Sequence, residues 1–209
     1  MLKAYKTVLR PSEVEFIEKK SRFIGHCFPA ATEEEALSRL AETRKRYYDA
    51  THNCWAYSLE NGQMRFSDDG EPGGTAGMPI MDTLIRRDIK NAVVIVTRYF
   101  GGILLGSGGL VRAYSKSASD AVQAAGCGVM SPCKVLEFAV DYPRYGGIEG
   151  FVKANAIVDD VEFMENVRFR VTVAEDRTAE FIAELTERTD GRSVPEVVDE
   201  RFIPIPLEE

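Results

Sequence analysis

The alternation of hydrophobic and polar residues predicts a strand hairpin and a helix near the start of the chain. Residues 13–29 contain two short strand-like runs, which meet near Lys19 and Lys20. Thr32 followed by Glu35 is a capping box, in which each side chain accepts a hydrogen bond from a free backbone N–H at a helix start. The amphipathic segment behind this box ends in three basic residues, which is favourable at the negative end of a helix dipole.

The middle of the chain predicts a second hairpin, a buried strand and a long helix. Residues 52–69 form two strand-like runs around Asn61-Gly62, a dipeptide typical of type I′ hairpin turns. Residues 91–100 are almost continuously apolar, as in a strand that is covered on both faces. Residues 110–126 have helical spacing, and the glycine in the last position is typical of a helix C-terminus.

The hydrophobic pattern restarts after Ser131-Pro132 and predicts a second domain. The order that it predicts is β-α-β-β-α-β over about 75 residues, which is the ferredoxin-like split unit. We therefore predict an α+β protein with two domains, residues 1–131 and residues 132–209, and place the boundary at Pro132.

Composition and charge indicate which binding partners and which cellular compartment to expect for this protein. A hydrophobic content of 44% and a charged content of 28% are ordinary for a globular protein with a buried core. Residues 1–131 hold 17 Lys and Arg against 15 Asp and Glu, whereas residues 132–209 hold 9 against 18. A nucleic-acid partner is therefore expected to meet the first domain. The four cysteines match no zinc spacing, no apolar run is long enough to cross a bilayer, and no secretory signal is present, so we expect a cytoplasmic protein without a membrane partner.

The segment RFSDDGEPGGTAGMPI at residues 65–80 predicts an acidic, glycine-rich loop that leads into a short helix beginning near Gly74-Thr75. Its candidate functional residues are Asp68, Asp69, Glu71, Gly73, Gly74 and Thr75. The three carboxylates suggest oxygen ligands for a divalent cation. They are equally compatible with a solvated turn, in which Asp68 or Asp69 accepts hydrogen bonds from backbone amides.

The segment GGILLGSGG at residues 101–109 separates the buried strand from the long helix and predicts an anion site. Free backbone N–H groups and the positive end of the dipole lie at the start of such a helix. The candidate residues are Arg98, Tyr99, Gly106, Ser107, Gly108, Gly109, Arg112 and Lys116. Arg98 and Tyr99 are expected to be exposed at the mouth of this loop. The alternative is that the glycines only permit close packing between strand and helix.

Catalytic patterns are sparse. Ser107 stands where a P-loop requires lysine, and neither the dinucleotide fingerprint nor a GxSxG elbow is present. The chain has two histidines, His26 and His52, as candidate bases for a nucleophile. We therefore predict no catalytic residues, no cofactor and no metal ion.

Both glycine-rich segments resemble the sequence signature of the IMPACT/YigZ family. FSDDGEPGGTAGMPI and VVIVTRYFGGILLGSGGLVRAYS are similar to its DDGEP-GTAG-P and V-RYFGG--LG-GGL-RAY blocks. The likeness covers residues 1–131, and residues 132–209 are similar to the C-terminal domain of bacterial members. This resemblance implies a ribosomal-protein-S5 domain-2-like α+β sandwich, followed by a ferredoxin-like domain similar to the last domain of elongation factor G. It also implies a role in translation, because eukaryotic relatives regulate translation initiation.

We therefore expect a non-catalytic protein that binds RNA or ribosome-associated factors, with phosphates held by the amides of residues 106–109 and the flanking cations. Two alternatives stay open. One is an enzyme acting on a small phosphorylated or peptide substrate through the acidic loop and His52. The other is a protein-interaction module whose glycine loops contact a partner surface.

Overall fold

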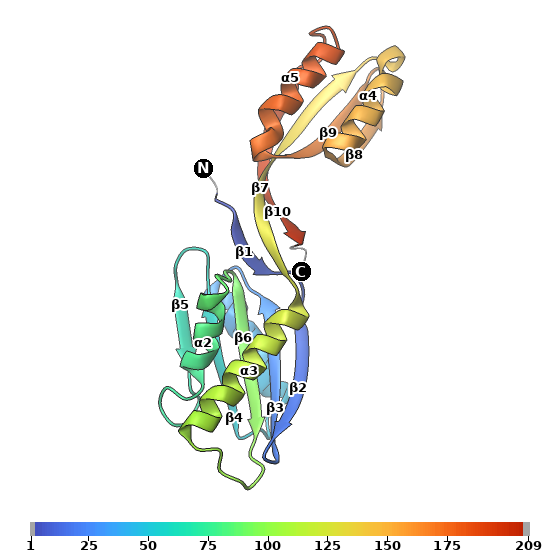
Figure 1. The fold of residues 1–209 in the computed structure, drawn as a ribbon. Coiled ribbons are helices and arrows are strands. Elements are labelled where there is room, and N and C mark those ends of the chain that lie inside the picture. The colour runs from blue at the N-terminus through green and yellow to red at the C-terminus, as the bar shows by residue number, and fades with distance from the viewer. Residues whose placement is uncertain (1–2, 207–209) are drawn as a thin grey trace. The chain divides into compact units, whose positions relative to one another are not determined.

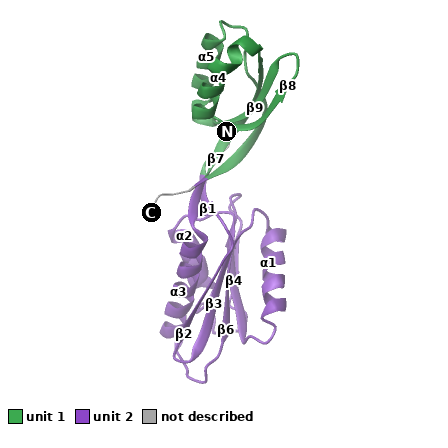
Figure 2. Ribbon diagram, turned by 90° about the vertical axis from the view of Figure 1, so that its right-hand side faces the viewer, with its two compact units in different colours: residues 1–4, 130–204 green, residues 5–129, 205–209 purple. Residues whose placement is uncertain are grey.

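A computed structural model describes residues 3–206 of the chain (Figure 1). The fold is α+β, with two antiparallel sheets and five α-helices in the described residues. The chain divides into two compact units, which Figure 2 shows in different colours. We call residues 5–129 the N-terminal unit, to which Ile205 also belongs. Residues 130–204 are the C-terminal unit.

The N-terminal unit contains a five-stranded antiparallel sheet with the strand order β2-β3-β6-β4-β5. Its strands are β2 (Ser12–Glu18), β3 (Ser21–Pro29), β4 (His52–Ser58), β5 (Met64–Ser67) and β6 (Ala92–Tyr99). Its helices are α1 (Glu33–Arg46), α2 (Gly77–Arg86) and α3 (Ser107–Ala125). The central strand β6 is the apolar run predicted at residues 91–100, and it is buried along nearly its whole length.

Helices cover both faces of this sheet. Helix α1 packs on one face over a small cluster that contains Leu40, Trp55 and Tyr57. Helices α2 and α3 pack side by side on the other face, over a larger cluster that includes Leu84 and Tyr114 (Figure 2). Because β6 lies between two layers of helix, its side chains are apolar on both sides.

The first predicted hairpin is confirmed, and the second differs in its turn. Lys19 and Lys20 connect β2 to β3 with φ angles of 45° and 66°, as a tight hairpin with two left-handed residues requires. Between β4 and β5 only Gly62 has a positive φ, and the Leu59 amide donates to the Gln63 carbonyl. The predicted type I′ turn is therefore wrong, because that turn requires a positive φ at both central residues.

The C-terminal unit has the predicted order β-α-β-β-α-β. Its elements are β7 (Cys127–Val140), whose first residues belong to the N-terminal unit, α4 (Tyr142–Asn155), β8 (Ile157–Phe163), β9 (Val167–Ala174), the short 3₁₀ helix Glu175–Arg177, α5 (Thr178–Arg188) and β10 (Glu196–Pro206), whose end belongs to the N-terminal unit. Strand β7 pairs with β9, β9 pairs with β8, and both β10 and the short strand β1 (Tyr5–Val8) pair with β7. The predicted boundary residue Pro132 lies inside β7, which continues through it as one strand.

None of the helices in the described part of the chain is long and apolar enough to cross a membrane.

Candidate functional site

Asp68 in the acidic loop fixes the start of helix α2. Its carboxylate accepts hydrogen bonds from the amides of Gly74, Ala76 and Gly77, at 2.8, 3.0 and 2.8 Å. The amides of Ala76 and Gly77 are orphan amides of the helix start, and Gly74 belongs to the loop before it, so Asp68 caps α2 from outside the helix. The helix consequently begins at Gly77 and not near Gly74-Thr75, as predicted from the sequence. Of the two interpretations of this acidic residue, the one based on backbone amides is correct.

The same three amides determine the pKa of Asp68. Burial raises the pKa of this carboxyl, but hydrogen bonds from Gly74, Gly77 and Ala76 together hold it below its ordinary value of 3.8. A carboxyl whose pKa is depressed by folding stabilises the protein above its unfolded-state pKa and loses this contribution as the pH falls through its folded-state pKa.

Replacement of Asp68 by alanine is therefore expected to lower the free energy of unfolding by about 1–3 kcal/mol at neutral pH. The difference from wild type should shrink as the pH falls below 3.8, where the carboxyl of the unfolded chain becomes protonated, and be smallest once the folded-state carboxyl is protonated as well. Denaturant titrations followed by the fluorescence of Trp55, the one tryptophan of the chain, measure both effects. Glu34→Ala, an exposed acid in the first turn of α1, is the control. A difference that is independent of pH would contradict this role for Asp68.

Asp69 and Glu71 have different partners from Asp68. Asp69 accepts hydrogen bonds from the Arg44 guanidinium at 2.5 Å and from the Asn53 amide at 2.7 Å. Glu71 is buried at the far end of the loop. The three carboxylates thus diverge to separate partners and do not converge on one point. Within residues 3–206, no group of three or more His, Cys, Asp and Glu side chains is arranged to hold a metal ion.

Glu71 is the centre of a buried polar network. Its Oε1 accepts a hydrogen bond from Arg98 Nη1 at 2.6 Å and one from the Tyr114 hydroxyl at 2.7 Å. Arg98 Nη2 also donates to Ser21 Oγ at 3.3 Å, and its guanidinium lies 5.5 Å from the centre of the Phe100 ring. This network connects the acidic loop, strand β6 and helix α3.

Arg98 is not the exposed cation that the sequence predicted. It is only 5% exposed, and its charge is compensated by Glu71. The neighbouring Tyr99 is half-buried, and its hydroxyl donates to Asp49 at 2.7 Å. Side chains of a strand alternate between its faces, and the face that carries Arg98 lies beneath the loop and α3. Arg98, which the sequence predicted as a phosphate contact, therefore forms a buried structural ion pair with Glu71.

His52 is held in one orientation beside this network. Its Nδ1 lies 2.8 Å from the Asp69 carbonyl oxygen. A carbonyl only accepts, so Nδ1 carries the proton and Nε2 is left with a lone pair in the neutral ring. Nε2 lies 3.9 Å from Glu71 Oε1.

The two glycine-rich loops meet in one pocket of about 440 Å³. The acidic loop contributes Gly70, Glu71 and Pro72, and the second loop contributes its last residues and the start of α3. The second loop and α3 supply Leu104, Leu105, Gly106, Ser107 and Leu110, and the remaining wall consists of Thr51, His52, Arg98 and Phe100. Helix α3, the acidic loop and the start of β4 thus place residues that are distant in the sequence around one cavity.

The start of helix α3 has the open character that the sequence predicted. Gly106 precedes the helix with φ of 71° and open space beside it, a conformation that side chains rarely adopt. No residue in the described part of the chain accepts a hydrogen bond from the amides of Ser107, Gly108 and Gly109. Ser107 and Gly108 are exposed, and Arg112 Nη1 would lie 3.5 Å from a Cβ atom at Gly108. The helix start and the guanidinium therefore face the same exposed spot.

One glycine of the second loop has a purely steric role. A Cβ atom at Gly101 would lie 2.0 Å from the backbone carbonyl carbon and oxygen of Lys20, so the loop packs directly on the β2–β3 turn. The interpretation based on packing is thus correct at Gly101, whereas at Gly106 the backbone angle and the open space are the reason for glycine.

Two shallow grooves flank α3: Arg112 lines one of them, and Lys116 lines both. The groove toward β2, of about 240 Å³, is lined by Lys19, Arg112 and Lys116, together with Glu18 and Phe16.

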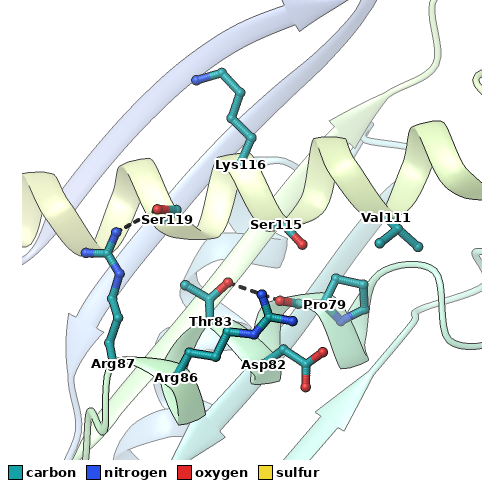
Figure 3. Close-up of a pocket in the computed structure, with 9 residues that line it drawn as sticks. All are labelled: Pro79, Asp82, Thr83, Arg86, Arg87, Val111, Ser115, Lys116 and Ser119. Atoms are coloured by element: carbon teal, nitrogen blue, oxygen red, sulfur yellow. Dashed lines mark hydrogen bonds between the residues drawn. The ribbon is translucent and has the colours of Figure 1, made fainter.

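The groove toward α2, of about 420 Å³, is lined by Arg86 and Arg87, several hydroxyl side chains and the stem of Lys116 (Figure 3). Figure 3 shows the Lys116 side chain directed away from the two arginines, while Arg87 donates to Ser119 at 2.7 Å. Five cations thus surround α3, with the acids Glu18 and Asp82 among them, and Lys116 also forms an ion pair with Asp120 on α3.

Sequence analysis missed Lys19, Arg86 and Arg87, because these residues lie far from the glycine loops in the sequence. It also missed Tyr114, which has the spacing of an ordinary core residue on α3. Burial raises the pKa of the Tyr114 hydroxyl well above its usual range and raises the pKa of the neighbouring Cys54 thiol to about 12. Neither group is ionised at neutral pH, so the network offers no thiolate or phenolate nucleophile.

Comparison with known proteins identifies the family. The family model for the Impact N-terminal domain matches residues 19–122, and a domain of unknown function (DUF1949) matches residues 138–192. The chain therefore belongs to the IMPACT family, which confirms the resemblance seen in the sequence.

Its relatives include bacterial proteins that match most of the chain. It is 40% identical over 196 residues to the IMPACT family member YvyE of Bacillus subtilis (strain 168), covering 92% of this chain and 90% of that protein. It is 33% identical over 178 residues to the IMPACT family member YigZ of Escherichia coli (strain K12), covering 83% and 87%. A solved structure described as that of a hypothetical protein matches with 29% identity and a TM-score of 0.62, over 95% of this chain and 99% of that chain.

Proposed function

We propose that the N-terminal unit binds single-stranded RNA or an RNA–protein particle in the cytoplasm and thereby regulates translation. The observation that carries this proposal is the set of five cations, contributed by the β2–β3 turn, α2 and α3, in the two grooves that flank α3. Cations distributed along a track, rather than concentrated in one cavity, match a polymer of phosphates.

The start of α3 adds a phosphate position to this track. Arg112 has no hydrogen-bond or ion-pair partner among residues 3–206, and it stands beside the free amides of Ser107 and Gly108. One guanidinium and the free amides of a helix N-terminus are a favourable environment for one phosphate group. Phe16, in the same groove as Lys116, offers an aromatic edge to an adjoining base.

The resemblance of both units to folds of ribosome-associated proteins also supports a role in translation. We propose that the N-terminal unit has the ribosomal-protein-S5 domain-2-like fold and the C-terminal unit the ferredoxin-like fold of the last domain of elongation factor G. The order β10-β7-β9-β8 across the second sheet, with α4 and α5 in the crossover positions, is compatible with that assignment. Both folds occur in proteins that act on the ribosome, and fold alone does not establish function.

Gly108→Ala is expected to weaken RNA binding without lowering the stability of the fold. Alanine replaces glycine within a helix, with only ordinary contact to Arg112, so the free energy of unfolding should rise by about 0.5–1 kcal/mol. The added methyl group occupies the spot that a phosphate would use, so the affinity for a single-stranded RNA oligomer should fall about fivefold at 0.1 M salt, the equivalent of one phosphate contact.

Gly146→Ala in α4 is the matched control, because it also adds a methyl group near a helix start with no atom within 4 Å. Fluorescence anisotropy at several salt concentrations measures both variants and the wild type. Affinity that does not change with salt, or that is equal in Gly108→Ala and wild type, would refute RNA binding at this site.

A further inference from the structure

The pocket between the two glycine loops has its own unused hydrogen-bonding groups. Its wall includes none of the five cations assigned above to RNA, and it shares only the start of α3, at Ser107, with the phosphate position proposed there. At about 440 Å³ it lies within the size range of small-molecule pockets.

Two acceptors in this wall lack donors. Glu71 uses only Oε1 toward Arg98 and Tyr114, and no described residue donates to its Oε2. His52 Nε2, which carries a lone pair in the neutral ring, lies 3.9 Å from Oε1 of the same carboxylate. His52 Nε2 and the Glu71 carboxylate thus line the pocket together as acceptors. An ammonium group has three hydrogens and can donate to both.

Two donors in the same wall lack acceptors. Arg98 Nε is buried and has no hydrogen-bond partner. The Ser107 amide, at the positive end of α3, has none within the described residues either. A carboxylate at the start of α3 would accept a hydrogen bond from the Ser107 amide, and it would be stabilised by the helix dipole and by the positive charge of Arg98 in the same wall.

The rest of the wall is apolar and partly uncovered. Leu104 is 83% exposed and Phe100 is 46% exposed, although both side chains border the pocket together with Leu105 and Leu110. A hydrocarbon group bound in the pocket would remove part of this surface from water.

We infer that this pocket binds a small zwitterion: an amino-acid-sized molecule with an ammonium group, a carboxylate and a hydrocarbon side chain. The ammonium group is bound by Glu71 and His52, the carboxylate by the start of α3, and the side chain by Phe100 and Leu104. The charges also balance, because Arg98 already neutralises Glu71 and a zwitterion adds no net charge to a partly desolvated site.

Isothermal titration calorimetry of the full chain tests this inference. The probes are L-leucine, leucinamide, which lacks the carboxylate, and N-acetyl-leucine, which lacks the ammonium group. Leucine should bind, and each modified probe should bind about 10-fold more weakly or worse, because each loses a charged hydrogen-bonding group. Absence of leucine binding at millimolar concentration, or equal binding of N-acetyl-leucine, overturns the inference.

Two variants locate the site without disturbing the buried ion pair. Leu104→Asp changes an exposed side chain, so it should fold normally while weakening leucine binding about 10-fold through the loss of an apolar contact and the added charge. His52→Ala removes one of the two acceptors and should weaken binding to a similar extent. Lys45→Gln, an exposed cation on α1 across the sheet, is the control and should bind as wild type does. Unchanged affinity in both pocket variants would place any leucine site elsewhere.

Discussion

Glu71→Ala is expected to lower the free energy of unfolding of the N-terminal unit by about 3–5 kcal/mol. The substitution leaves the Arg98 guanidinium buried without its counter-charge, and breaking one side of a buried pair has a cost of this size. It also removes the acceptor of the Tyr114 hydroxyl. Denaturant titration followed by Trp55 fluorescence reports on this unit, because Trp55 lies in its strand β4.

The stability of Glu71→Ala is compared with that of a double variant, which lacks both charges, and with that of a variant in an exposed ion pair. Glu71→Leu combined with Arg98→Met removes both charges, and it should be much less destabilised than either single substitution. Glu42→Ala breaks an exposed pair with Arg39 on α1, which should change stability by no more than about 1 kcal/mol. If Glu71→Ala is no worse than Glu42→Ala, the network centred on Glu71 is not a stabilising element.

Simultaneous replacement of Lys19, Arg112 and Lys116 by glutamine is expected to reduce affinity for single-stranded RNA about 100-fold at 0.1 M salt. Each lost phosphate contact lowers the slope of log affinity against log salt by about 0.7, so three lower it by about 2. All three side chains are exposed, and their loss should leave the free energy of unfolding almost unchanged.

The control removes the same number of positive charges from the opposite face of the sheet. Arg39, Arg44 and Lys45 lie on α1, away from the α2–α3 face (Figure 2). Their replacement by glutamine should alter RNA affinity only slightly, through the change in net charge. Equal losses in the two triple variants would show a general charge effect and would argue against a binding track on α3.

Much of the local structure could be predicted from the sequence. The hairpin at Lys19-Lys20, the buried strand β6 and the glycine that ends α3 follow from patterns of a few residues, because backbone angles and hydrogen bonds of strands, turns and helix ends are set by near neighbours. The open start of α3 was predicted in the same way.

The function of individual polar residues could be predicted only in part. Asp68 looked like one of three possible cation ligands, yet it caps α2 through amides six to nine residues away. Arg98 looked exposed because it adjoins a loop, whereas the face of β6 on which it lies is covered by the acidic loop and α3. Sequence proximity to a loop does not show which side of a strand is buried.

The sequence by itself determined the α+β class, the family, the position of both glycine loops and the free amides at Ser107, since each depends on residue order alone. Only the tertiary structure decided that Glu71 neutralises Arg98, that both loops border one pocket, and that Lys19 joins Arg112 in a groove. The physical reason is that these contacts connect residues 27 positions apart or more, and their geometry is set by how the sheet and helices pack and not by local backbone preference.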